Sequence, residues 1–421
     1  MEGQRMERGR PLVWIGDDAI PRLLRFCAET GRRRLLLVAD SNTYRALGAR
    51  VEASLREQGC DVKSVVLADE EVLADARHIL RVMLACDRTD RTFLAVGSGT
   101  ITDIARFVSH RTGGSFISVP TAPSVDGFTS MGAPLIVEGV KMTALAHAPV
   151  AIFADLPTLV SAPPLMIAAG FADMLGKCTS VADWRLGSLL WGGSYDDEIA
   201  KRSLRAVQTC MDHADAIAAA TPQGVRILME ALIESGFCML DFGSSLPASG
   251  IEHHYSHYWE MALLQSGKPA ILHGAKVGVA TIIAAGFYER IRQLSRDQAA
   301  DLLGRSRLPA RDEELRRIRA AYGDQAEEVI ATQEPFLNMS EADFGKLKSK
   351  IRDHWAEIQG IAAHVPSPAR ITELLATVGG PTEVRALGLT DSDQAAVVRS
   401  GHYLRAHFTV RRLIGALFPE G

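Results

Sequence analysis

The stretch TFLAVGSGTITDI, residues 92–104, decides the fold class of this chain. An apolar, β-rich run at residues 92–96 meets the turn Gly97-Ser98-Gly99-Thr100, and a helical pattern follows from Ile101. A strand that passes through a short turn into a helix is the unit from which parallel α/β sheets are built.

The same turn is also a candidate phosphate site. Glycines let a phosphate approach the backbone closely, and the helix that follows presents free N–H groups and a positive dipole end. The dinucleotide fingerprint is incomplete, because Thr102 stands where its third glycine would be. An ordinary strand-to-helix turn and a nucleotide site therefore both fit the turn on its own.

Outward from this turn, the first 155 residues alternate β-rich runs with amphipathic segments. This alternation predicts an α/β domain with a parallel sheet over residues 1–155 and, because strand-like runs nearly vanish afterwards, an all-helical domain over residues 156–421. The predicted strands are residues 12–15, 34–39, 62–67, 92–96, 115–119 and 150–154, and the predicted helices between them include residues 19–27, 43–58 and 74–84. Helix breaks are expected at residues 244–250, 266–269, 366–368 and 379–381.

Composition excludes several classes of protein. The 421 residues are 47% hydrophobic and 23% charged, with a net charge of −4. This balance provides no basic footprint for nucleic acid, and no apolar stretch with the uninterrupted length of a membrane span is evident, so a soluble, cytoplasmic protein is expected. The six cysteines form no Cys-x-x-Cys pair and are expected to be reduced core residues.

Four of the twelve histidines lie between residues 253 and 273. Neutral imidazole is the commonest side-chain ligand of borderline divalent metals, and two histidines with one carboxylate would suffice for a catalytic site. His253 and His257 are i and i+4, so a helix places both on one face, while His254 points elsewhere. His273 begins a new helical run, and Asp173, an acid in an apolar helical stretch, is the best carboxylate candidate. Exposed or core-satisfied histidines are the alternative.

Two further segments carry polar groups suited to a nucleotide or a polyol. The loop PTAPSVDGFTS, residues 120–130, combines prolines that stiffen it with hydroxyl groups and Asp126. A turn held by its own side-chain hydrogen bonds fits this loop equally well. Asp40 ends the second predicted strand and could hold the adenosine ribose or cap the following helix.

Taken together, these motifs resemble the sn-glycerol-1-phosphate dehydrogenase family. The resemblance rests on GSGTITD at 97–103, PTAPSVDGFTS at 120–130, GFADMLGK at 170–177, EHHYSH at 252–257, LHGAKV at 272–277 and GGPTEVRALGL at 379–389. Its wider superfamily includes glycerol dehydrogenase, iron-activated alcohol dehydrogenases and dehydroquinate synthase. The resemblance implies a Rossmann-like N-terminal domain and an all-α C-terminal domain, which is the dehydroquinate synthase-like fold.

The resemblance also implies roles for individual residues. The metal ligands would be Asp173, His253 and His273, and the residues facing substrate would be Asp126, His257 and the ligand Asp173. The implied cofactor contacts of NAD(P) are Asp40 and Asn42 for adenosine, Gly97, Ser98, Gly99, Thr100 and Ile101 for the pyrophosphate, and Thr121, Ser124 and Ser130 for nicotinamide. One divalent metal is expected, with zinc first and nickel or iron as alternatives.

The implied reaction is hydride transfer between sn-glycerol 1-phosphate and dihydroxyacetone phosphate. Asp126 and His257 would be catalytic, and Lys141, Lys177 and Lys276 are the cations considered for the phosphate. A homodimer or larger homo-oligomer is expected. The chain departs from the family pattern at two positions, since Arg106 stands where many relatives have lysine and Ala275 where many have Glu. These differences affect the expected details of cofactor binding and leave the expected chemistry unchanged. The alternatives are a glycerol or polyol dehydrogenase and a dehydroquinate synthase-like sugar-phosphate cyclase. A third alternative is an inactive scaffold, which the intact set of Asp173, His253 and His273 disfavours.

Overall fold

The computed structural model describes residues 9–87, 89–137 and 140–418, and the chain divides into two compact units. The first unit runs to Met174 and includes Asp212–Asp241, and the second comprises Leu175–Met211 and the chain from Phe242 onward. Helix α7 (Pro164–Leu190) continues without a break through the division, so it belongs to both units.

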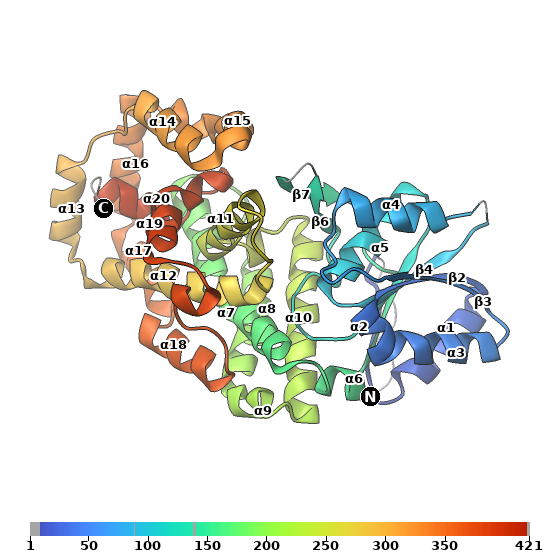
Figure 1. The fold of residues 1–421 in the computed structure, drawn as a ribbon. Helices are drawn as coiled ribbons and strands as arrows, with labels where there is room; N and C mark the ends of the chain where they lie inside the picture. Colours follow the sequence, from blue (N-terminus) through green and yellow to red (C-terminus); the bar gives the residue numbers. More distant parts are fainter. Residues whose placement is uncertain (1–8, 88, 138–139, 419–421) are drawn as a thin grey trace. The chain divides into compact units, whose positions relative to one another are not determined.

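The first unit is built on a six-stranded parallel sheet of order β1-β8-β5-β4-β2-β3 (Figure 1). Each strand matches a run expected from the sequence to within about one residue at either end, which confirms the α/β prediction. The bounds are β1 (Leu12–Gly16), β2 (Arg34–Asp40), β3 (Asp61–Leu67), β4 (Thr92–Gly97), β5 (Phe116–Pro120) and β8 (Ala151–Asp155).

Side chains that alternate along the strands form two separate cores. Leu35, Leu37 and Ala39 of β2 face the core that holds α1 (Ala19–Glu29) and α3 (Ala49–Glu57). Leu36 and Val38 face the opposite core, which holds α4 (Ala76–Ala85) and α5 (Gly99–Arg111). Because both faces are covered by helices, the strands read as continuous apolar runs in the sequence.

The strand order identifies where a ligand of this sheet is expected. From β2 the chain crosses to β3 on one side, and from β4 it crosses to β5 on the other, so the direction of winding reverses between β2 and β4. In open α/β sheets, ligands bind beyond the carboxyl ends of the strands at such a switch point. The residues at this point are Asp40, which ends β2, and the Gly97 turn, which ends β4.

Two local features of the first unit were not predicted. An antiparallel pair, β6 (Gly132–Val137) and β7 (Val140–Leu145), follows the 120–130 loop. Pro134 within the first of these runs weakens the strand signal, because proline cannot donate to a ladder. The helix expected at residues 43–58 is divided into α2 (Ser41–Thr43), a π-helical turn (Tyr44–Gly48) and α3.

The rest of the chain is helical, as predicted. The first unit also contains α6 (Leu156–Val160), α9 (Ala214–Ala218) and α10 (Pro222–Phe242). The second unit contains α8 (Asp197–Asp212), α11 (Ile251–Gln265), α12 (His273–Gln293), α13 (Arg296–Arg305), α14 (Arg311–Tyr322), α15 (Ala326–Leu337), α16 (Glu341–Asp353), α17 (Trp355–His364), α18 (Pro368–Thr377), α19 (Asp391–Ser400) and α20 (Val410–Leu417), with short 3-10 turns at Leu246–Ala248, Gly323–Gln325, Val384–Leu387 and Gly401–Leu404.

Helix α7 is long and apolar enough to pass a test for a membrane span, but 89% of its most apolar window is buried within the protein. It is therefore a core helix. The last strand of the sheet, β8, ends at Asp155, where the predicted α/β domain also ends. The predicted domain boundary between residues 155 and 156 stays a prediction. The two compact units divide the chain elsewhere, because the first unit continues to Met174 and includes Asp212–Asp241.

Candidate active site and metal centre

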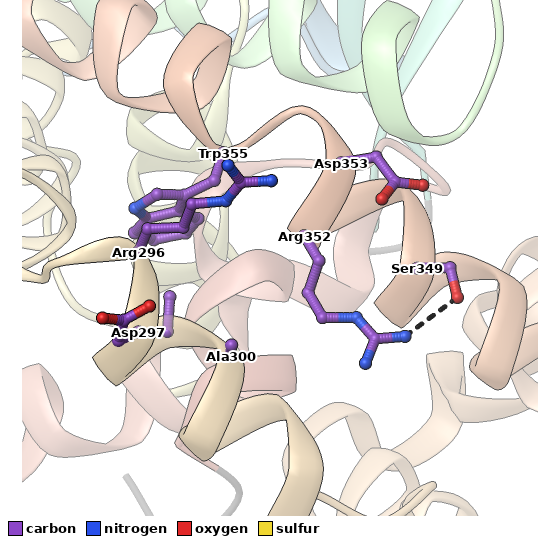
Figure 2. A pocket seen from close by; sticks show the side chains of 8 residues that line it. Arg296, Asp297, Ala300, Ser349, Arg352, Asp353 and Trp355 are labelled. Atoms are coloured by element: carbon purple, nitrogen blue, oxygen red, sulfur yellow. Dashed lines mark hydrogen bonds between the residues drawn. The ribbon is translucent and has the colours of Figure 1, made fainter.

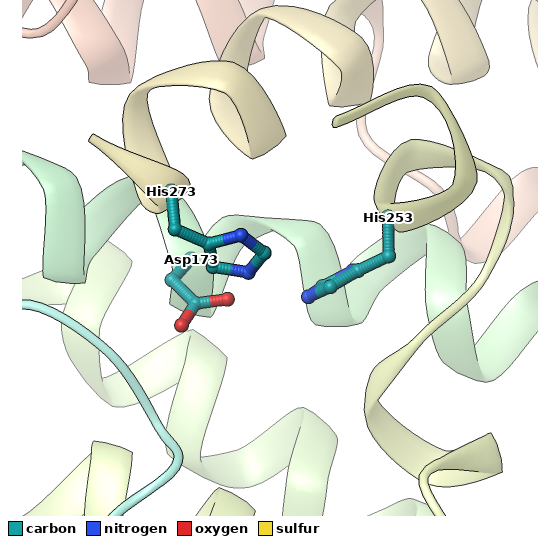
Figure 3. Close-up of side chains that lie close together, drawn as sticks. All are labelled: Asp173, His253 and His273. Carbon is teal, nitrogen blue, oxygen red and sulfur yellow. The ribbon is translucent and has the colours of Figure 1, made fainter. Parts of the chain in front are cut away.

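Asp173, His253 and His273 offer one ligand atom each, and all three atoms lie within 4.8 Å of one another. Figure 3 shows the carboxylate and the two rings turned toward a common point. Asp173 comes from α7 and is fully buried, His253 comes from α11, and His273 is the first residue of α12. Two imidazoles and a carboxylate at this separation suit a divalent metal with an open position for substrate.

The local fold explains how residues far apart in sequence converge here. Helix α11 carries His253 and His257 on one face, and the predicted break after Gln265 lets α12 begin at His273. The ring of His273 consequently lies 5.3 Å from that of His253 and 5.4 Å from that of His257, measured between centroids.

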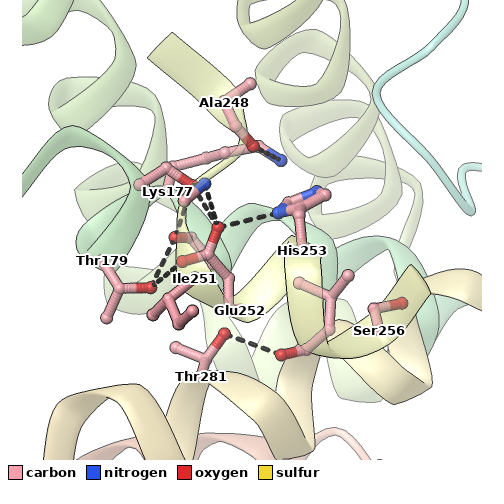
Figure 4. A network of polar contacts seen from close by, with 12 residues as sticks. Lys177, Thr179, Ala248, Ile251, Glu252, His253, Ser256 and Thr281 are labelled. Atoms are coloured by element: carbon pink, nitrogen blue, oxygen red, sulfur yellow. Dashed lines mark hydrogen bonds and ion pairs between the residues drawn. The ribbon is translucent and has the colours of Figure 1, made fainter. Parts of the chain in front are cut away.

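Glu252 holds His253 in place through a buried network (Figure 4). Its carboxylate accepts hydrogen bonds from Thr179 Oγ1 at 2.6 Å, from Ser180 Oγ at 2.6 Å and from Gly250 N at 2.7 Å, and its Oε1 lies 2.8 Å from His253 Nδ1. Burial raises the pKa of this carboxyl, but the hydrogen bonds from His253, Ser180 and Thr179 bring the pKa below its usual value. An ionised Glu252 keeps the proton of His253 on Nδ1, so Nε2 is left to bind a metal.

A second set of possible ligands shares His273. His257, Glu260 and His273 also have ligand atoms within 4.8 Å of one another, and all three are half-buried. The ammonium group of Lys276 lies 3.3 Å from Glu260 Oε2. Because this cation already neutralises Glu260, the set with Asp173 is the better metal site.

The 120–130 loop is attached to the first ligand. The backbone N–H of Asp126 donates to Asp173 Oδ2 at 3.0 Å, and the hydroxyl of Ser235 donates to Asp126 Oδ2 at 2.8 Å. Close packing fixes the loop further: a Cβ on Gly170 would lie 1.8 Å from Pro123 O, and one on Gly236 would lie 1.9 Å from Thr129 Oγ1. Helices α7 and α10 can approach the loop this closely only with glycine at these positions.

The Gly97 turn packs tightly and leaves the start of α5 without a side-chain cap. A Cβ on Gly97 would lie 2.6 Å from Ile101 Cβ, so this position requires glycine. The hydroxyls of Ser98 and Ser124 hydrogen bond to each other, and Thr121 N donates to Gly97 O at 3.3 Å. The turn and the 120–130 loop thus form one connected edge beyond β4 and β5, and the uncapped N–H groups of α5 suit an anion.

Asp40 caps the helix that follows it. Its Oδ1 accepts from Asn42 N at 2.8 Å and from Thr43 N at 2.9 Å. Asn42 Oδ1 in turn accepts from Arg45 at 2.9 Å. Capping occupies one carboxylate oxygen, so it is compatible with a ribose contact through the other.

Arg106 donates hydrogen bonds to backbone carbonyl groups of the loop at residues 127–132. Its guanidinium is fully buried and donates to Asp103 Oδ1 at 2.7 Å, to Gly132 O at 2.8 Å, to Phe128 O at 3.2 Å and to Gly127 O. Ser130 Oγ lies 3.3 Å from Gly127 O and 3.2 Å from Gly132 O, so it supports the same loop. A guanidinium at this position supplies several directed donors to carbonyl groups.

The three lysines considered for the substrate phosphate already have other contacts. Lys177 is buried and donates to Ala248 O at 3.2 Å, and Lys276 is buried beside Glu260. Lys141 lies near Asp103: burial raises the pKa of Asp103 to about 7, and the charges of Arg106 and Lys141 oppose that rise. None of these contacts identifies a phosphate site.

A separate pocket of about 360 Å³ lies among α13, α16 and α17 (Figure 2). Its charged residues are Arg296, Asp297, Arg352 and Asp353, and Arg352 donates to Ser349 Oγ at 3.1 Å. Arginines and aspartates balance in number, and the lining includes none of the candidate site residues. This pocket therefore contributes nothing to the candidate active site.

Two supporting residues had no role assigned from the sequence. Glu252 stands directly before His253, and an acid next to a candidate metal ligand is a signal that could have identified it. Ser235 lies on α10, more than 100 residues from Asp126, and no local sequence pattern predicts the hydrogen bond between the two.

The chain matches the family model described as iron-containing alcohol dehydrogenase over residues 14–163. It is 39% identical over 399 residues to the glycerol-1-phosphate dehydrogenase [NAD(P)+] of Halalkalibacterium halodurans, covering 94% of this chain and 90% of that protein. It is 40% identical to the enzyme of the same name from Geobacillus stearothermophilus, covering 96% and 92%. The chain belongs to the glycerol-1-phosphate dehydrogenase family. The predicted family and its class, the NAD(P)-linked dehydrogenases, are thereby confirmed.

Solved structures show the same fold at low identity. A probable glycerol dehydrogenase from Sinorhizobium meliloti 1021 superimposes with a TM-score of 0.62 at 18% identity, covering 98% of each chain. A 1,3-propanediol oxidoreductase gives a TM-score of 0.64 at 14% identity, covering 99% of this chain and 100% of that one. These likenesses support the predicted fold class of a parallel α/β region followed by helices.

Proposed function

We propose that this chain interconverts sn-glycerol 1-phosphate and dihydroxyacetone phosphate by hydride transfer with NAD(P), using one divalent metal ion. The observation that carries the proposal is the convergence of Asp173, His253 and His273 within 4.8 Å, in a chain about 40% identical to enzymes of that name over nearly its whole length.

The residues present fit a divalent metal. Asp173 is fully buried, and a divalent cation bound beside its carboxylate would offset the cost of burying that charge. Glu252 keeps His253 in the tautomer that a ligand needs. We expect zinc first, with nickel or ferrous iron as alternatives, because nitrogen and oxygen ligands suit all three. A divalent ion bound here would polarise the ketone and stabilise the negative charge that develops on its oxygen.

Asp126 and His257 are proposed to act on the substrate. Ser235 and the 120–130 loop fix the carboxylate of Asp126, which can then accept a hydrogen bond from a substrate hydroxyl. His257 lies one helical turn from His253, and its Nδ1 lies 3.5 Å from Glu260 Oε2. An imidazole held in this way can give a proton to the substrate oxygen in the reducing direction and take one back in the other.

The cofactor is proposed to lie across the switch point of the sheet. The Gly97–Ile101 turn would hold the pyrophosphate, because the start of α5 has N–H groups without a side-chain cap. Asp40 and Asn42 would contact the adenosine ribose from the end of β2. Thr121, Ser124 and Ser130 would contact the nicotinamide. A homodimer in the cytoplasm is proposed on the family resemblance alone.

Product stereochemistry tests the proposal. Protein reconstituted with zinc, nickel or ferrous iron is supplied with dihydroxyacetone phosphate and NADH or NADPH, and the product is analysed enantiospecifically. The proposal predicts net cofactor oxidation and sn-glycerol 1-phosphate. Formation of sn-glycerol 3-phosphate, or equal rates with unphosphorylated dihydroxyacetone, would contradict it. Cofactor that returns unoxidised after turnover would indicate a cyclase.

A further inference from the structure

A cluster of nitrogen donors lies in the second unit beside the metal ligands. His254 is on α11, directly after His253. Arg405 and His407 belong to the segment between the 3-10 turn Gly401–Leu404 and α20. The rings of His254 and His407 are 5.5 Å apart between centroids.

Several donors of this cluster have no partner among the residues that the structure describes. His254 is fully buried, and neither of its ring nitrogens makes a hydrogen bond. The buried Nδ1 of His407 likewise lacks a partner. Arg405 donates to Ser245 Oγ at 3.1 Å, and no carboxylate of the described chain pairs with it.

Arg405 gives the cluster its positive charge, and no carboxylate among the residues that the structure describes pairs with it. Burial and, to a smaller extent, the charge of Arg405 lower the pKa of His407 to about 4. Arg405 stands two residues before His407 in the chain. A half-buried guanidinium without an anion loses part of its hydration without compensation, and each buried polar group without a partner is destabilising as well.

An anion bound next to Arg405 would accept hydrogen bonds from the donors of this cluster and balance its charge. Guanidinium has five N–H donors in a planar fork that matches phosphate oxygens, and a neutral imidazole adds one further N–H donor. Arg405 and His407 are both half-buried, so a ligand can reach them, whereas His254 packs behind His407.

The position also suits the substrate. Successive Cα atoms are about 3.8 Å apart, so the backbone of His254 lies directly beside that of His253, one of the candidate metal ligands. In dihydroxyacetone phosphate only one methylene and one ester oxygen separate the ketone carbon from phosphorus. A substrate with its ketone oxygen at the metal therefore carries its phosphate a few ångströms away.

We propose that Arg405 and His407, supported from behind by His254, form the subsite for the substrate phosphate. The inference rests on the proposed function and deepens it, since it assigns selectivity for a phosphorylated triose to named residues. It replaces the three lysines considered from the sequence.

The test compares two substrates and one probe on the metal-loaded protein. Arg405→Met removes the guanidinium N–H donors. The kcat/KM of this variant for dihydroxyacetone phosphate should fall about 10–100-fold, whereas its kcat/KM for dihydroxyacetone should change little. Inorganic phosphate titrated by calorimetry should bind the variant more weakly than the unaltered protein. Arg385→Met is the matched control, because Arg385 forms an exposed ion pair with Asp391, and it should change neither measurement.

His407→Gln provides a second variant in case Arg405→Met does not fold, and it should lower the same selectivity to a smaller extent. Unchanged selectivity and unchanged phosphate binding in the folded variants would overturn the subsite. If the unaltered protein itself shows no preference for the phosphorylated triose, the proposed function fails. Phosphate titration of the same variants then decides separately whether this cluster binds an anion.

Discussion

The turn after β4 and the histidine cluster of α11 and α12 are built from different parts of the chain. The turn uses backbone groups of consecutive residues, Gly97 to Ile101, and glycine is required because a Cβ would collide with Ile101. The cluster uses side chains of Asp173, His253 and His273, up to 100 residues apart, each supported by neighbours. A backbone site thus depends on one local conformation, whereas a side-chain site depends on the packing of several helices.

The largest effect is expected from removing a side-chain ligand. His273→Ala should lose bound metal and lower turnover by at least about 10³-fold, since several kcal/mol of charge stabilisation disappear with the ion. Metal content per folded protein and steady-state rates measure this. His254→Ala is the control and should retain metal, because His254 faces His407 instead. Full metal occupancy in His273→Ala would contradict the assignment.

A smaller effect is expected from a residue behind the ligand. Glu252→Gln should weaken metal affinity about 10–100-fold, as is typical when the partner of a metal-binding histidine is lost. The affinity can be measured by competition with a chelator. Glu260→Gln is the matched control, and its metal affinity should stay near that of the unaltered protein. A larger loss in Glu260→Gln than in Glu252→Gln would place the ion at His257, Glu260 and His273.

The backbone site can be altered by a single methyl group. Gly97→Ala places a Cβ 2.6 Å from Ile101 Cβ, so the turn must shift, and NADH affinity should fall about 10-fold. Metal affinity should be unaffected. Gly286→Ala, at an α12 position where a Cβ meets nothing within 4 Å, is the control. Unchanged cofactor affinity in Gly97→Ala would remove the turn from the cofactor site.

The smallest effect is expected at Asp40. The carboxylate should favour NADH over NADPH through repulsion of the 2′-phosphate, and Asp40→Ala should relax this preference about 5-fold, equivalent to about 1 kcal/mol. The same change removes a helix cap and should lower stability by about 1 kcal/mol. Steady-state kinetics with both cofactors separate the two effects. A strong preference for NADPH that survives the substitution would exclude a ribose contact.

This contrast explains how much the sequence could predict. The six strands and the Gly97 turn are local patterns, and each was located closely. The hairpin of β6 and β7 was not, because Pro134 masks its first strand. The candidate ligand set could be named from unusual residue types, since histidines are concentrated there and Asp173 interrupts an apolar run. His407 and the neighbouring Arg405 carry no such signal, because only tertiary packing brings the ring of His407 to 5.5 Å from that of His254.

Anomalous diffraction from crystals grown with zinc or nickel, collected at the absorption edge of the metal, tests the central claim most directly. The account predicts one strong peak within about 2.0–2.3 Å of Nε2 of His253, a ring nitrogen of His273 and an oxygen of Asp173. A peak bound instead by His257 and Glu260, or none in metal-reconstituted active protein, would contradict it.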